Sequence, residues 1–179
     1  MKNKLILMIC FFLAGIIIAP GVYALDGIFF GLNPEANAHT RDTREGVSLG
    51  SGFILGFDLN SRFSTGIKAS YFNNLDTLGL AEGQAFFRYY PWQRPGNTGG
   101  LFVQAEAGSV IYFENKEIFP WVSGGLSVGW RFNIGKNWFL EPVARAGYPY
   151  IWGGGITAGL KFQKADKKQT VIINNQDSE

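Results

Sequence analysis

The stretch GVSLGSGFILGFDL, residues 46–59, decides the fold class. Its large apolar side chains fall mostly on odd-numbered positions, from Val47 to Leu59, while glycine, serine or aspartate occupies most of the even-numbered ones. Successive side chains of a β-strand point to opposite faces, whereas a helix repeats every 3.6 residues. The period of two therefore predicts a strand with one apolar face and one face of small or polar residues.

The same alternation recurs seven more times along the chain. The predicted strands are 25–33, which is the weakest, and then 46–59, 62–72, 79–90, 100–113, 121–134, 137–147 and 152–162. Most are about as long as the 9 to 11 residues with which a tilted strand crosses a bilayer. Turn signals at 60–61, 91–99 and 135–136 alternate with connections at 34–45, 73–78, 114–118 and 148–151.

An even number of antiparallel strands can close on itself, which removes the exposed edges of an open sheet. We therefore predict an all-β fold over residues 25–162, an eight-stranded antiparallel up-and-down β-barrel with both ends of the chain on one side.

Residues 1–24 have the layout of a secretory signal peptide. Lys2 and Lys4 precede an apolar run over 5–19, a Pro-Gly pair follows, and small residues lead to a predicted cleavage site after Ala24. Fifteen apolar residues are few for a membrane span, which needs about 20. Removal of this segment takes away Cys10, the only cysteine, and leaves 14 basic and 14 acidic residues. We expect an exported protein without disulfides, with no electrostatic reason to bind nucleic acid.

Two classes of β-barrel, soluble and transmembrane, show this alternation, and they differ in which face of the sheet contacts water. A soluble periplasmic ligand-binding barrel would turn the apolar rows inward and expose the others to water. Those other rows are rich in glycine, although a water-facing surface normally carries more charge. We therefore predict a transmembrane barrel with apolar rows facing lipid and a polar lumen. The predicted lumen charges are Lys68, Glu82, Arg88, Glu106, Arg131, Glu141, Arg145 and Lys161.

Charges inside a narrow barrel must pair, because burial of an isolated ion is very costly. Three acids and five bases leave a positive excess, which we expect tyrosine hydroxyls, water or further pairings to meet. Lumen glycines, including Gly50, Gly52, Gly66, Gly125, Gly129 and Gly159, are expected to leave unusual room.

Aromatic residues gather near the predicted strand ends, as in the two interfacial girdles of membrane barrels. The predicted girdle residues are Tyr71, Tyr112, Trp121, Tyr148 and Trp152 near one rim, and Tyr89, Trp92 and Trp138 near the other.

With this pattern the chain resembles the small eight-stranded outer-membrane barrels of diderm bacteria, of the OmpA transmembrane domain, OmpX and OmpW type. The last strand carries the most specific likeness, with outward positions Ile156, Ala158, Leu160 and Phe162. The resemblance implies a monomer in outer-membrane lipid, and it implies that this strand is the signal read by the outer-membrane assembly machinery. The chain departs from the pattern in that 163–179 follow the final aromatic, and we predict a flexible periplasmic tail there.

Few residues suit catalysis or metal binding. His39 is the only histidine, and no nucleotide-binding motif is present, so we expect no cofactor, no metal and no enzymatic activity. One alternative is a lipid A-modifying acyltransferase that uses His39 with Asp76 and Thr77, which fall in the first two predicted outer loops. Against this alternative, Thr77 stands where that group has a serine, and no amphipathic helix precedes the first predicted strand.

Two non-enzymatic roles follow from the barrel. One is a structural or surface protein of the cell envelope. The other is a narrow passage or binding site for small molecules, and the likeness to OmpW implies a hydrophobic ligand.

Overall fold

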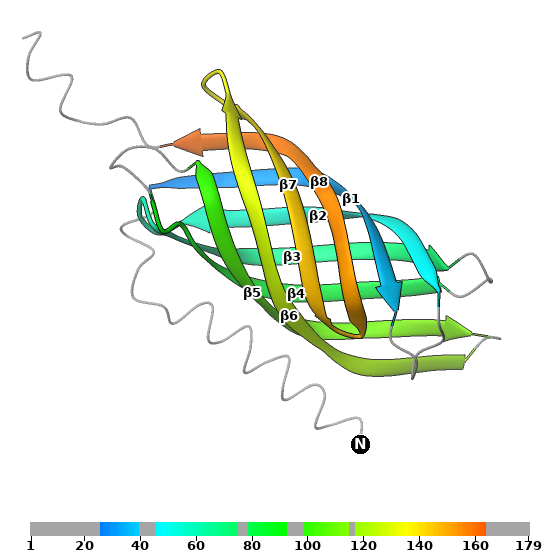
Figure 1. Ribbon diagram of the computed structural model, residues 1–179. Helices are drawn as coiled ribbons and strands as arrows, with labels where there is room; N and C mark the ends of the chain where they lie inside the picture. The colour runs from blue at the N-terminus through cyan, green and yellow to red at the C-terminus, as the bar shows by residue number, and fades with distance from the viewer. Residues whose placement is uncertain (1–25, 40–45, 75–78, 93–98, 115–116, 164–179) are drawn as a thin grey trace, which may run out of the picture.

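The computed structural model describes residues 26–39, 46–74, 79–92, 99–114 and 117–163. It is a closed barrel of antiparallel strands in the order of the sequence (Figure 1). The strands are β1 (Gly27–His39), β2 (Val47–Asp58), β3 (Phe63–Asn74), β4 (Gly79–Tyr89), β5 (Gly100–Glu114), β6 (Glu117–Ile134), β7 (Trp138–Tyr148) and β8 (Tyr150–Gln163). The predicted fold class is confirmed. No helix among the described residues is long and apolar enough to cross a membrane.

The two ends of the barrel differ, and we name them by their connections. At the turn end, β2 joins β3, β4 joins β5 and β6 joins β7, and β1 starts beside the end of β8. The other four connections lie at the opposite end, the loop end. The β5–β6 hairpin projects farthest there (Figure 1), because it pairs as far as Glu114 and Glu117 while β6 and β7 pair only from Gly124 and Tyr148.

The first strand is longer than predicted. We expected it to end at residue 33, but it continues through Pro34 to His39. Pro34 lacks a backbone N–H, and the described β1–β8 pairs skip Asn33 and Pro34 while the β1–β2 pairs continue without a gap. The proline is tolerated at this interruption, and the extra residues add Glu35 and Asn37 to the lumen wall.

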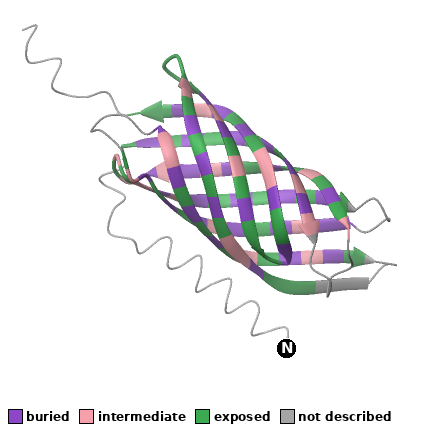
Figure 2. Ribbon diagram, in the orientation of Figure 1, coloured by how far each residue is buried: buried purple, intermediate pink, exposed green. Residues whose placement is uncertain are grey.

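Exposure alternates along the strands, which gives the checkered pattern of Figure 2. Outward positions are exposed and largely apolar, for example Leu32 at 67% and Leu126 at 61%. Following this alternation from Ile28 to Phe162, no outward position of the described strands carries a charged side chain. The inward rows hold the buried charges instead.

Candidate functional site

The lumen is the part of the molecule where charged chemistry concentrates. All eight predicted lumen charges are buried there, together with two acids that the prediction did not include, Glu35 and Asp58. Five acids therefore face five bases, so the positive excess expected from the sequence does not arise. Glu35 falls in the predicted connection 34–45, which begins at Pro34, and Asp58 falls on the predicted polar face of 46–59 but is not among the predicted lumen charges.

The charges nearest the turn end form the turn-side cluster, which comprises Asp58, Arg88, Arg131, Glu141 and Lys161. Glu141 is its centre, because it accepts two hydrogen bonds from Arg88, at 2.8 and 3.2 Å, and one from Arg131 Nε. Arg131 also lies 3.8 Å from Asp58 Oδ1, and Asp58 accepts a hydrogen bond from Ser64 at 2.6 Å. One carboxylate thus holds two guanidinium groups inside the barrel.

Aromatic rings enclose those two guanidinium groups. The Arg88 guanidinium carbon lies 3.9 Å from the Phe102 ring centroid, and that of Arg131 lies 4.1 Å from Phe29 and 4.7 Å from Phe139. A cation over an aromatic face is attracted by the ring quadrupole, most strongly where water is excluded. The rings therefore compensate part of the hydration that the two arginines lose.

Four phenylalanine rings around this cluster each pack against a glycine directly opposite on the paired strand. A Cβ on any of these glycines would overlap the ring, so the expectation that lumen glycines leave open room is wrong. At Gly50 the Phe72 ring and backbone atoms fill the same space, and at Gly52 and Gly125 serine or backbone atoms do. The four pairs are Phe29–Gly56, Phe86–Gly66, Phe102–Gly129 and Phe139–Gly159.

The remaining charges form the loop-side cluster, which comprises Glu35, Lys68, Glu82, Glu106 and Arg145. Arg145 is its centre and contacts three carboxylates, Glu82 at 2.9 Å, Glu106 at 3.3 Å and Glu35 at 3.4 Å. Lys68 pairs with Glu35. Here one guanidinium is shared among three carboxylates, which is the reverse of the arrangement around Glu141.

An apolar cluster lies above these charges at the loop end, made of Phe72, Leu80, Val110, Tyr112 and Tyr150. The prediction placed Tyr112 in an outer girdle, and this is wrong: its side chain is only 7% exposed and points inward. Its register partner Leu80 is fully buried, and directly opposite residues share a face of the sheet.

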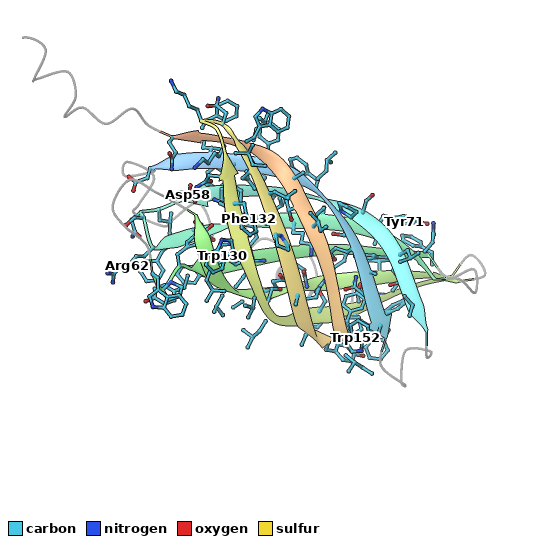
Figure 3. All side chains as sticks on the ribbon, turned by 45° about the horizontal axis from the view of Figure 1, so that its top comes forward. Asp58, Arg62, Tyr71, Trp130, Phe132 and Trp152 are labelled. Atoms are coloured by element: carbon cyan, nitrogen blue, oxygen red, sulfur yellow. The ribbon has the colours of Figure 1, made fainter. Side chains whose placement is uncertain are left out.

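The other predicted girdle residues are exposed. Figure 3 shows Tyr71 and Trp152 toward the loop end, and Asp58 and Arg62 at the opposite end. Trp121 is also exposed, at 54%. It lies on the projecting hairpin and pairs with Val110, whose side chain faces inward, so Trp121 is on the inner face of the sheet and not in an outward girdle. The exposed set is Tyr71, Tyr89, Trp92, Trp121, Trp138, Tyr148 and Trp152.

The residues predicted as an assembly signal lie on the outward face of β8, where Ile156 and Phe162 are exposed by about half. His39 ends β1, but its side chain, Asp76 and Thr77 lie outside the described residues, as do the predicted signal peptide and the tail beyond Gln163. Within the described ranges, no three His, Cys, Asp or Glu side chains are grouped so as to hold a metal ion.

No family model matches the sequence, and no curated protein matches it. The fold is similar to that of Neisserial surface protein A, with a TM-score of 0.55 at 12% identity over 77% of this chain and 96% of the other. It is also similar to the outer membrane protein OprG of Pseudomonas aeruginosa, with a TM-score of 0.55 at 10% identity over 79% and 97% of the two chains. The chain therefore has the fold of the small eight-stranded outer-membrane barrels.

Proposed function

We propose that this protein is an integral barrel of the bacterial outer membrane. The observation that carries the proposal is the outward surface, where a continuous apolar belt contains no charged side chain. Charged residues on the lipid face of a barrel are destabilising, while a soluble protein rarely exposes an apolar patch of such extent. Export through residues 1–24 and assembly through the aromatic end of β8 complete this proposal.

Within that membrane, we propose a structural or surface role carried out by a monomer. The ten lumen charges of the described strands are buried, and within this part of the chain nine of them make ion pairs with one another. An eight-stranded barrel is just wide enough for side chains to fill it. A filled and charge-neutral lumen favours a closed barrel that acts through its surface.

A narrow passage is the second candidate role, and one observation favours it. Some buried polar atoms, among them Asn33 Oδ1 and Ser70 Oγ, have no hydrogen-bond partner within the described part of the chain. Buried groups of this kind are commonly satisfied by water. Planar-bilayer conductance decides between the two roles: a baseline that stays flat supports the closed barrel, and discrete openings support the passage.

The membrane assignment is tested by substituting Leu126 on the outward face. We expect the full chain, expressed in a diderm host, to fractionate with the outer membrane and to change its gel migration on heating. Leu126→Arg should strongly reduce the folded band, because an arginine near the middle of the lipid face costs about 2–4 kcal/mol. Lys136→Glu, a charge change in an exposed turn, serves as the control and should fold normally.

We propose no catalytic role for His39. Replacement by alanine should leave lipid A acylation unchanged when the protein is expressed in a host whose lipid A is analysed by mass spectrometry. Loss of an acylated species on replacement would favour the acyltransferase alternative.

A further inference from the structure

Gln104 on β5 lies where the two charged clusters meet. Its side chain is only 3% exposed. Its oxygen Oε1 accepts a hydrogen bond from Arg88 Nε at 2.8 Å, and its Nε2 donates one to Glu106 Oε1 at 2.7 Å. Arg88 belongs to the turn-side cluster and Glu106 to the loop-side cluster. Gln104 therefore links the two clusters by one hydrogen bond to each.

The charges on either side explain why this position suits an uncharged amide. The turn-side cluster has three bases and two acids, so its formal charge is +1, and the loop-side cluster has the reverse and is −1. Gln104 presents its oxygen to the positive side and its nitrogen to the negative side. A glutamate here would face the Glu106 carboxylate, a lysine would face Arg88, and an apolar residue would leave two buried charged groups each short of a partner.

With Gln104 in place, the polar contacts run the length of the barrel. From the loop end they pass from Asn37 through Glu35 and Arg145 to Glu106, and beyond Gln104 from Arg88 through Glu141 and Arg131 to Asp58. Buried networks of this kind give interaction energies between residues that do not touch.

We propose that Gln104 couples the two clusters energetically, so that loss of a charge from one cluster changes the cost of losing a charge from the other. This coupling is independent of the proposed role of the protein, because it concerns only how the lumen is held together.

The test is a double-mutant cycle between one carboxylate of each cluster, Glu82→Gln and Glu141→Gln. The full chain is folded into phosphatidylcholine vesicles and unfolded with urea. In the otherwise native chain, the effect of the double variant on the unfolding equilibrium constant should differ from the product of the single effects by about fivefold. In a Gln104→Leu background, the effects should multiply to within about twofold.

Gln84→Leu is the matched control. Gln84 is similarly buried. It donates a hydrogen bond to Ser123 at 3.2 Å and accepts one from Arg145 at 3.4 Å, so its hydrogen bonds stay within the loop-side half. The coupling between the carboxylates should survive in this background. Coupling that persists without Gln104, or that is lost equally without Gln84, would overturn the proposal.

Milder variants test the same link if the carboxylate substitutions prevent folding. Tyr90 accepts a hydrogen bond from Arg88 at 3.1 Å, and Ser127 donates one to Glu106 at 2.6 Å. Tyr90→Phe and Ser127→Ala should show a smaller coupling of about threefold, and Gln104→Asn, whose amide is one methylene too short to reach both partners, should abolish it. Additive effects in the native chain would contradict the proposal.

Discussion

The two halves of the lumen stabilise buried charge in opposite ways. In the turn-side cluster one carboxylate, Glu141, binds two guanidinium groups that are enclosed by aromatic rings. In the loop-side cluster one guanidinium, that of Arg145, binds three carboxylates and the Gln84 amide, with one ring, that of Tyr150, 4.7 Å from its guanidinium carbon. Loss of a carboxylate should therefore matter more for Glu141, which two cations share, than for any one of the three carboxylates that share Arg145.

Glu141→Gln should therefore have the largest effect. It removes the negative charge shared by two fully buried arginines and replaces one of the two acceptor oxygens with an amide donor. Breaking a buried pair in this way costs about 3–5 kcal/mol. Urea unfolding in lipid vesicles measures the loss. Glu82→Gln is the matched change in the other cluster, and it should cost clearly less because Arg145 keeps Glu35 and Glu106. Equal losses of unfolding free energy in the two variants would contradict this difference between the clusters.

Gly56→Ala should have the next largest effect. A Cβ at this position overlaps the ring of Phe29, which packs against Arg131, so the ring must move away from the cation. Overpacking of this kind costs about 1–3 kcal/mol. Gly83→Ala is the control, since a Cβ there meets no atom within 4 Å, and its unfolding midpoint should hardly change.

Arg131→Lys should have the smallest effect of the three. The charge is kept, but the planar fork and its contacts with Phe29 and Phe139 are lost, at a cost of about 1–2 kcal/mol. The same unfolding assay measures this loss. An unchanged stability would show that the aromatic rings contribute shape rather than cation binding.

The sequence predicted the fold well because a period of two survives in all eight strands. The eight predicted lumen charges are buried, and in the sequence each falls out of phase with its apolar neighbours. The same alternation places Tyr112 on the inner face, because it lies between the outward-facing Ile111 and Phe113. Grouping it with the neighbouring aromatic residues led to the wrong girdle assignment.

The sequence alone could not predict which side chains contact one another in the lumen. Pro34 locally favours a loop, so the sequence around Glu35 does not indicate a strand. The pairing of β1 with β2 shows that Glu35 lies directly opposite Gly50, with its side chain in the lumen. The pairing of each Phe ring with a glycine depends on the cross-strand register, which a single sequence does not specify. The glycines were therefore read as empty space although rings fill it.

The central claim, that the apolar rows contact lipid, is tested most directly by spin labels on the barrel. Cys10 is the only cysteine of the chain, so in a Cys10→Ser background single cysteines can be introduced at Val128 on the outward face and at Lys136 in an exposed turn. In folded protein in vesicles, the label at 128 should collide with oxygen and be shielded from a water-soluble nickel complex, with the opposite result at 136. A label at 128 that meets the nickel complex as freely as the label at 136 would contradict the account.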